Sequence, residues 1–340
     1  MKYGRLLIAF VIALHGLVFF AGFVAPYDPV QQVRTLPYAP PTHVHFVDAG
    51  GRLHLQPFVY AQVPDANAYD VYVDDTSTRY PVQLLVTGPS YAVVPGIDNT
   101  VHLFGVDSPG RFSLLGTDKF GRDVFSRVLY GGRVSVAAGL LATACALLVG
   151  LVLGTTAGFF GGIVDRAVMR VADVFMAVPW LYLLFAVRAA LPLQIDTRTT
   201  FLVLVGILGV VGWARPARMI RGIVLSARER TYVRAADGFG ATTPYLLRHH
   251  ILPHTYGVLL TQAAVLVPQY LLAEVSLSFL GLGIGEPTAS WGSMLGALQQ
   301  YHVLTSYWWM CAPAAALVVM ALGYHALTSL VHERARLVAN

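Results

Sequence analysis

Long, mostly apolar stretches are the feature that most constrains the fold of this chain. Residues 134–160 contain no charged side chain. An α-helix needs about 20 residues to cross the roughly 30 Å hydrocarbon core of a bilayer. Only 12% of the 340 residues are charged, compared with about 25% in a typical soluble domain. The sequence therefore predicts an all-α membrane protein with six transmembrane helices, in the runs 6–24, 134–160, 171–191, 201–224, 256–279 and 308–327.

The first apolar run has two interpretations. Lys2 and Arg5 precede it, as basic residues precede the apolar region of a secretory signal peptide. However, residues 6–24 are long for such a region, and Ala21-Gly22-Phe23 is a poor cleavage site. We therefore expect residues 1–25 to form a retained first transmembrane helix.

Residues 26–110 are polar and rich in Pro, Gly and Asp. Turn signals such as Gly50-Gly51 and Pro95-Gly96 separate short alternating runs, which are typical of strands. The stretch is too long for an ordinary connection, so it predicts a β-rich insert between the first and second transmembrane helices. His43 and His45 share one face of a predicted strand. Solvated histidines are commoner than metal ligands, and no metal site is predicted. The expected strands lie in the runs 43–47, 53–60, 69–73, 82–86, 91–94 and 101–106.

A polar, arginine-rich segment, residues 226–254, lies between two apolar runs. The residues Ser226–Asp237 predict a short helix, which the glycines of Gly238–Gly240 end. Thr243-Pro244 is a restart signal, because a threonine can cap a helix and a proline suits its first position. Pro253 is expected to end the second helix. The segment therefore predicts a helix-turn-helix that projects from the membrane.

The triplet Arg234-Ala235-Ala236, followed by Gly240 and Ile251-Leu252-Pro253, resembles the "EAA…G…I-LP" loop of permease subunits of binding-protein-dependent ABC importers. In that family the loop is cytoplasmic and docks into a cleft of the ATPase subunit. Arg234 replaces the family's glutamate, so that one contact is not expected here. The alternative is that the apolar patch packs on the permease's own helices. The resemblance implies a coupling surface made of Arg234, Ala235, Ala236, Gly240, Ala241, Tyr245, Leu246, Leu247, Arg248, Ile251, Leu252 and Pro253, with Tyr245, Leu246 and Leu247 as its buried contacts and Arg248 and His249 as polar ones.

A second motif, LGTDKFGRDVFSRVLYGGRVS at residues 115–135, resembles the "GTDxxGRDxxSRxxxGxRxS" signature of C-type permeases of dipeptide, oligopeptide and nickel importers. Val124, Val128 and Leu129 share one helical face, which predicts an amphipathic interfacial segment at 111–133. This segment leads into the permease core at 134–340. The matching signature positions are Gly116, Thr117, Asp118, Gly121, Arg122, Asp123, Ser126 and Arg127, followed by Gly131, Arg133 and Ser135.

Six crossings place both termini on the same side of the membrane. The positive-inside rule makes that side cytoplasmic, because the basic N-terminus, the turn at 166–170, the segment 215–248 and the tail 332–336 all fall there. The 26–110 insert is then periplasmic. We expect a multi-pass protein of the bacterial inner (plasma) membrane. Four cations disagree with the rule and are partly offset by Asp118 and Asp123: Lys119, Arg122, Arg127 and Arg133.

The chain does not contain the residues for ATP hydrolysis. A P-loop needs a lysine after a glycine, and the only lysines, Lys2 and Lys119, do not follow one. The resemblance therefore implies that ATP and Mg²⁺ bind to separate ATPase subunits, and no cofactor is expected on this chain. The glycines at 281–285 have the wrong spacing for a dinucleotide site. The net charge of +5 comes almost entirely from arginine and fits cytoplasmic loops better than a nucleic-acid site.

Glu274 interrupts the apolar run 256–279. A carboxylate at the bilayer centre costs roughly 2.5–3.5 kcal/mol on insertion scales, so this side chain should face protein or a water-filled path. Two interpretations remain open at this point. Glu274 lines the translocation path, or it forms a structural hydrogen bond to a neighbouring span or to a partner permease.

Together, the two motifs imply a non-catalytic permease of the type I ABC importer fold. It would form a path for peptides or similar small solutes with a second homologous permease. Two ABC ATPases and a periplasmic substrate-binding protein would complete the assembly. An ion-coupled secondary transporter is the alternative. Such a transporter is expected to contain inverted repeats and several intramembrane ionisable groups, whereas this sequence shows no clear repeat and only Glu274 and a few histidines. A membrane enzyme lacks a clustered nucleophile, a metal triad or paired carboxylates. Permeases for dipeptides, oligopeptides, nickel complexes and opines resemble one another in sequence.

Overall fold

The structure, a computed structural model, describes residues 2–339 except 67, 69, 70, 95, 191 and 193–195. The chain divides into two compact units. The first, which we call the helical unit, comprises residues 1–9, 136–277 and 320–340. The second, the mixed unit, comprises residues 10–135 and 278–319.

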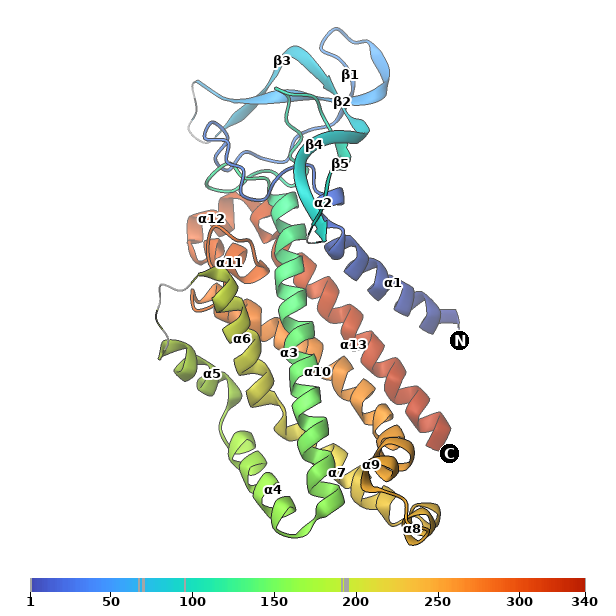
Figure 1. Ribbon diagram of the computed structural model, residues 1–340. Coiled ribbons are helices and arrows are strands. Elements are labelled where there is room, and N and C mark those ends of the chain that lie inside the picture. Colours follow the sequence, from blue (N-terminus) through green and yellow to red (C-terminus); the bar gives the residue numbers. More distant parts are fainter. Residues whose placement is uncertain are drawn as a thin grey trace. The chain divides into compact units, whose positions relative to one another are not determined.

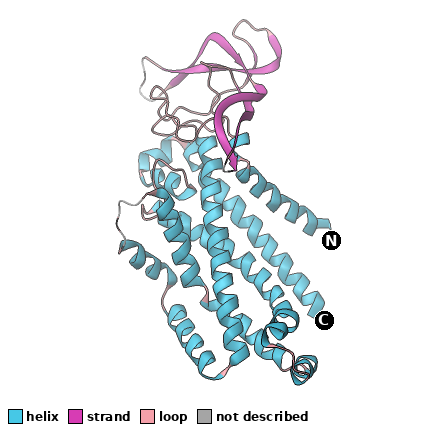
Figure 2. Ribbon diagram, viewed as in Figure 1, coloured by secondary structure: helices cyan, strands magenta, loops and turns pink. Residues whose placement is uncertain are grey.

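Helices and short loops make up the helical unit (Figures 1 and 2). It contains most of α3 (Val124–Phe160) and α10 (Tyr256–Phe279), together with α4 (Gly162–Ala177), α5 (Trp180–Ala189), α6 (Thr197–Gly212), α7 (Ala214–Arg228), α8 (Thr231–Gly238) and α9 (Thr243–Leu246). A π-helical turn, η1 (Leu247–Ile251), and a 3-10 turn, η2 (Leu252–Thr255), join α9 to α10.

A stripe of glycines brings α3 against α7. Gly150, Gly154 and Gly158 recur every four residues, and small residues at this spacing allow close approach of helix backbones. A Cβ added to Gly154 would lie 2.5 Å from the carbonyl oxygen of Ala217, and one added to Gly158 would lie 2.9 Å from that of Arg221. The close helix contact that the spacing predicts is therefore confirmed.

Three helices of the described chain are long and apolar enough to cross a membrane: Val124–Phe160, Thr243–Phe279 and Trp308–Leu330. Helices α6 and α7 meet the same test only as a pair, bent by 42°, and counting that pair as one span gives four. Near the N-terminus, α1 (Lys2–Phe19) contains the shorter apolar helix Gly4–Phe19. These lengths support a helical membrane protein, whereas six crossings remain a proposal.

The predicted helix over 171–191 is wrong as a single element. Helix α4 ends at Ala177 and α5 begins at Trp180. Pro179 lies at the break and Val178 is extended, with ψ 128°. The cause is local, because proline lacks an N–H and disfavours helical backbone in the residue before it. Residue 191 lies outside the described residues.

The mixed unit contains the strands of the predicted insert. Strands β1 (His45–Val47), β2 (Leu53–Pro64) and β3 (Tyr72–Pro81) form an antiparallel sheet in the order β1-β2-β3. Strands β4 (Gln83–Val94) and β5 (Ile97–Gly105) form a separate hairpin, in which Val94 faces Ile97. The β-rich character of the insert agrees with the alternating runs, and Figure 2 shows both sheets in magenta.

Two strand boundaries differ from the prediction. The runs 82–86 and 91–94 belong to one strand, β4, with a register shift between Thr87 and Tyr91. The run 69–73 is displaced, because β3 starts at Tyr72 and continues to Pro81; residues 69 and 70 lie outside the described residues. Polar residues such as those of β3 can continue a strand when one of its faces is solvated.

Residues 281–303, which lack a predicted helix, contain short helical segments. These are α11 (Trp291–Leu295), η3 (Gly296–Gln299) and α12 (Tyr301–Ser306), followed by η4 (Trp308–Cys311) and α13 (Ala312–Ala339). Ser290 begins α11 with a capping box, in which Ser290 and Ser293 each accept a hydrogen bond from the other's backbone N–H. Trp291 is buried and donates from Nε1 to the carbonyl of Val128 at 2.8 Å. A local cap therefore gives a helix where periodicity alone predicts none.

Candidate functional site: the 226–254 segment and the arginine network

The 226–254 segment folds as a helical projection of the helical unit. Helix α7 ends at Arg228, α8 follows from Thr231, and the chain then turns at Gly240, whose φ is +85°. Only glycine adopts this backbone conformation without strain. Helix α9 begins at Thr243, with Pro244 in its first turn. The predicted helix-turn-helix is present in this form (Figure 1).

Two predicted boundaries in this segment are wrong. The helix expected over Ser226–Asp237 is interrupted between Arg228 and Thr231, where Arg230 is extended. Pro253 does not end the second helix, because η1 and η2 carry the chain directly into α10. A proline in the first turn of a helical segment has no intrahelical donor to lose. This explains how η2 tolerates Pro253.

The buried side of the segment packs on the chain's own helices. Leu246 is 3% exposed and Ile251 is fully buried. Ile251 forms a core cluster with Ile220 and Val224 of α7, and Leu247 packs against this cluster. Leu246 is thus buried and Leu247 packs internally, and their role as docking contacts stays a prediction.

The exposed side carries aromatic and basic side chains. Phe239, in the turn between α8 and α9, is 93% exposed, and Tyr245 is 48% exposed. Arg234, Arg248 and His249 are also exposed. An exposed aromatic side chain surrounded by polar residues often marks an interaction site. The sequence analysis did not select Phe239. Its position between Gly238 and Gly240, in the expected turn, could have indicated an exposed aromatic side chain.

The predicted coupling residues are divided between the exposed side and the buried side of the segment. Exposed positions are Arg234, Ala235, Gly240, Tyr245, Arg248 and Pro253; Ala236, Ala241, Leu247 and Leu252 are half-buried, and Leu246 and Ile251 are buried.

Two arginines of α7 connect the base of the 226–254 segment to α3 and α4. Arg228 donates from Nη1 to the carbonyl of Phe159, at the end of α3, at 3.0 Å. Arg221 of α7 forms an ion pair with Asp165 of α4. The base of the projecting segment is thus tied to two neighbouring helices.

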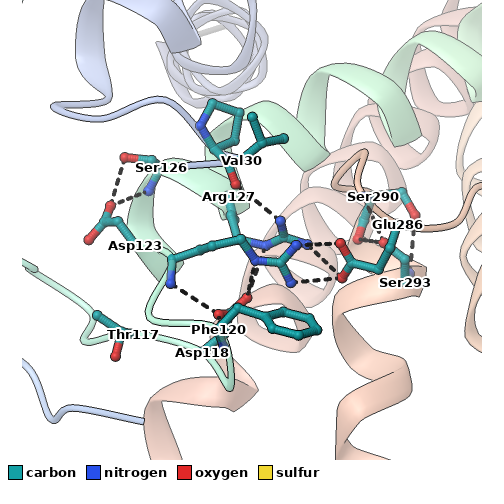
Figure 3. A network of polar contacts seen from close by, with 12 residues as sticks. Val30, Thr117, Asp118, Phe120, Asp123, Ser126, Arg127, Glu286, Ser290 and Ser293 are labelled. Carbon is teal, nitrogen blue, oxygen red and sulfur yellow. Dashed lines mark hydrogen bonds and ion pairs between the residues drawn. The ribbon is translucent and has the colours of Figure 1, made fainter. Parts of the chain in front are cut away.

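The second motif builds an arginine network in the mixed unit (Figure 3). Arg122 Nε lies 2.7 Å from Asp118 Oδ2, and its Nη2 lies 2.9 Å from Glu286 Oε1. Arg127 Nη2 lies 3.0 Å from the same Glu286 oxygen, and its Nη1 donates to the carbonyl of Pro29 at 3.1 Å. Arg122 and Arg127 are 3% and 1% exposed. Two buried cations therefore share two carboxylates, Asp118 and Glu286.

The charges of the arginines control the ionisation of Glu286. Burial raises its pKa, but the hydrogen bond from Arg122 and the positive charges of Arg127 and Arg122 outweigh burial and hold the pKa below its usual value. Glu286 itself is 44% exposed at its side chain. Because Glu286 lies far from the signature in sequence, the motif gave no indication of this partner.

Other signature residues hold the chain before α3 in place. Asp123 accepts hydrogen bonds from the backbone N–H and the hydroxyl of Ser126, both at 2.7 Å, so it caps the helix. Burial nevertheless raises the pKa of Asp123, with Ser126 opposing it. Thr117 donates to the carbonyl of Leu36 at 2.5 Å. Gly121 has φ +70°, and a Cβ there would lie 1.9 Å from the carbonyl oxygen of Val33.

The amphipathic interfacial segment predicted over 111–133 is helical only in its second part. Residues 111–123 are not helical, and α3 begins only at Val124. Arg122 and Ser126 are buried together with Val124. The cause is charge pairing, because buried arginines are tolerated when carboxylates and carbonyls satisfy them.

Glu274 lies in α10 and is fully buried. Its role in the translocation path stays a prediction.

In the described residues, no group of three or more His, Cys, Asp or Glu side chains is placed to hold a metal ion. His43 and His45, the histidines considered in the insert, both lie beside Asp74, with His45 Nε2 at 3.2 Å from Asp74 Oδ2.

Comparison with known proteins supplies the family. Residues 150–337 match the family described as binding-protein-dependent transport system inner membrane component. The oligopeptide transport system permease protein OppC of Bacillus subtilis (strain 168) is 35% identical over 229 residues, which cover 67% of this chain and 72% of that protein. The probable D,D-dipeptide transport system permease protein DdpC of Escherichia coli (strain K12) is 36% identical over 230 residues, 67% of this chain and 74% of that protein.

A third relative is the dipeptide transport system permease protein DppC of Bacillus subtilis (strain 168). It is 38% identical over 201 residues, which cover 59% of this chain and 61% of that protein. The family match extends over more than half of the chain and includes the whole 226–254 segment. The chain belongs to the family of binding-protein-dependent transport system inner membrane components.

Proposed function

We propose that this chain is one permease subunit of an ATP-driven importer for peptides or similar small solutes. It would pair with a second homologous permease and work with two ABC ATPases and a periplasmic substrate-binding protein. Family membership supports the ATP-driven assembly over an ion-coupled transporter. The names of the relatives, which refer to oligopeptide, dipeptide and D,D-dipeptide transport, support the solute class.

The observation that carries the coupling mechanism is the two-sided 226–254 segment. Phe239 and Tyr245 are exposed, while Leu246 and Ile251 are buried and Ile251 packs on α7. The exposed side would dock into an ATPase cleft. Because the buried side is part of the packed core, force on Phe239 would pass to α7 and α10 rather than bend a loose loop. Closure of the ATPases around ATP would then tilt these helices and shift the permease between two access states.

The membrane arrangement follows the sequence prediction. The six crossings would be formed by α1, α3, the α4–α5 region, the bent α6–α7 pair, α10 and α13. The segment 226–254 and both termini would be cytoplasmic by the positive-inside rule. The protein would reside in the bacterial inner membrane, with the residues near 111–133 close to its outer interface. Labelling of single cysteines at 55 and 239 with a membrane-impermeant maleimide in intact cells would test this, since only position 55 should react.

The insert at residues 26–110 would face the periplasm and contact the substrate-binding protein or the outer loops of the partner permease. Its sheet β1-β2-β3 and hairpin β4-β5 provide a folded surface outside the apolar spans. Deletion of residues 40–105 should weaken docking of the binding protein or transport. Unchanged docking together with unchanged transport would discard this role.

Reconstitution tests the function as a whole. The complete transporter in proteoliposomes should accumulate peptides from a tryptic hydrolysate only when ATP and the binding protein are supplied. Uptake that persists without ATP, while a proton or sodium gradient is maintained, would instead support the ion-coupled alternative. Turnover of a solute by the isolated chain would support a membrane enzyme.

A further inference from the structure

Three arginines on one face of α7 differ in their partners. Arg215, Arg218 and Arg221 recur every three residues. Arg218 pairs with Asp173 and Arg221 with Asp165, both on α4. Arg215, one turn earlier, forms no ion pair or hydrogen bond with any other described residue, and it is exposed. Arg215 lies both in the predicted span 201–224 and at the start of the basic segment 215–248, near the cytoplasmic end of the span. A cation within a membrane-spanning segment commonly marks a path for polar solutes.

Arg215 lines a cavity of about 140 Å³ inside the helical unit. The cavity lies where α6 meets α7, a pair bent by 42°. Discontinuous membrane helices frequently form the solute sites of transporters. Apolar side chains line one part of the cavity, including Phe175, Met176 and Leu266, while Gln269 and Tyr270 of α10 add polar groups. The cavity is smaller than a typical site for a whole drug-sized ligand, so it would hold one end of a solute.

The hydroxyl of Tyr270 is the second observation that points to a ligand. Tyr270 is 4% exposed, and its oxygen has no hydrogen-bond partner among the described residues. Gly212, at the end of α6, makes room for it, because a Cβ there would lie 1.5 Å from the Tyr270 oxygen. A buried hydroxyl without a partner costs stability. Its position in this cavity therefore suggests that a bound solute supplies the missing acceptor.

We propose that Arg215, Gln269 and Tyr270 form a carboxylate-binding site on the translocation path, which receives the C-terminal carboxylate of a transported peptide. The Arg215 guanidinium and the Tyr270 hydroxyl would donate to the carboxylate oxygens, since only acceptors satisfy both groups. The amide of Gln269 would donate a further hydrogen bond. Phe175 and Met176 would contact the apolar part of the terminal residue. This inference rests on the proposed import function and names the part of the solute that the path recognises.

The test uses the complete transporter in proteoliposomes, with a tryptic casein hydrolysate as the probe. Peptide uptake is measured by mass spectrometry, and the melting temperature of each purified complex is measured in detergent. Arg215→Leu should lower uptake at least tenfold, and Arg215→Lys should restore part of it. Arg218→Gln is the matched control, since Arg218 has its own carboxylate partner; its uptake should stay within twofold of wild type.

Tyr270→Phe separates a binding role from a structural one. Removing a hydroxyl that has no partner should leave the melting temperature unchanged or raise it, whereas uptake should fall threefold to tenfold. Wild-type uptake in both Arg215→Leu and Tyr270→Phe would overturn the site, as would a fall in melting temperature in Tyr270→Phe that matches its loss of uptake. A wild-type transporter that imports no peptide would overturn the import function itself, and this outcome is visible before any variant is examined.

Discussion

Arg127 and Glu286 lie 159 residues apart in the sequence, yet Arg127 Nη2 is 3.0 Å from Glu286 Oε1. This contact joins the start of α3 to the loop that precedes α11. Arg122 shares the same carboxylate. The second signature motif thus acts within the mixed unit as a set of structural residues, which fix the chain at the beginning of a long apolar helix.

Glu286→Gln should destabilise the protein, because it leaves Arg122 and Arg127 buried with Asp118 as their remaining carboxylate. Loss of one partner from such a network should lower the free energy of unfolding by about 2 kcal/mol. This is less than the loss expected when a fully buried ion pair is broken, because Glu286 is partly exposed. The measurement is the melting temperature of the purified protein in detergent. Glu229→Gln, which removes an exposed partner of Arg228, should change it little. Equal effects of the two variants would contradict the network's structural role.

The same pair predicts a dependence on pH. The folded-state pKa of Glu286 is lowered, because the arginine contacts outweigh burial. A lowered folded pKa means that the pair stabilises fully above the unfolded pKa, about 4.3, and that the contribution is lost as pH falls through the folded pKa. The melting-temperature difference between wild type and Glu286→Gln should therefore shrink between about pH 5 and pH 3. A difference that stays constant over this range would show that the charge of Glu286 is not the cause.

Phe239→Ala should weaken binding of the ATPase without weakening the fold. The side chain is 93% exposed, so its removal deletes no internal contact, whereas an aromatic anchor at an interface is commonly worth a tenfold or larger change in Kd. Leu246→Ala should show the opposite pattern and destabilise the chain by about 2–4 kcal/mol, because Leu246 is buried. Affinity for the ATPase by surface plasmon resonance and melting temperature distinguish the two effects.

Gly154→Ala should disturb the packing of α3 on α7. Its Cβ would lie 2.5 Å from the backbone oxygen of Ala217, so one helix must shift, at a cost of about 1–3 kcal/mol. Gly222→Ala in α7 is the control, since no atom lies within 4 Å of its added Cβ. Alanine is the better helix former, so Gly222→Ala should be neutral or stabilising by up to about 1 kcal/mol. Thermal unfolding in detergent should show a lower melting temperature for Gly154→Ala and an unchanged or higher one for Gly222→Ala.

Residue types and short spacings predicted those parts of the fold that depend on residues close together in the sequence. The glycine spacing at 150, 154 and 158 predicted a close helix contact, and the structure contains it. The turn at Gly240 and the restart at Pro244 were also readable from residue type. The break at Pro179 falls inside the single run predicted over 171–191, although the rule for proline and its preceding residue could have predicted it.

Long-range pairing could not be predicted in this way. Arg122 belongs to the predicted interfacial segment 111–133, and nothing in the motif indicated that Glu286 and Asp118 allow it to be buried. Leu246 and Leu247 looked like docking residues because they are apolar within a polar segment, whereas Leu246 is buried and Leu247 packs against the cluster of Ile220, Val224 and Ile251. Tyr270 and Gly212 carry no motif, and only the fold brings them together.

The central claim is that the exposed side of the 226–254 segment docks on an ATPase subunit. Its most direct test is a single cysteine at position 239, in a chain with Cys145 and Cys311 replaced by alanine, co-expressed with its ATPase partners. A short bifunctional maleimide should crosslink this position to an ATP-hydrolysing subunit, and the yield should change when ATP is bound. A cysteine at Leu55, 97% exposed in β2, should capture none. Failure of position 239 to capture an ATPase in any nucleotide state, or capture that is no stronger than at position 55, would contradict the account.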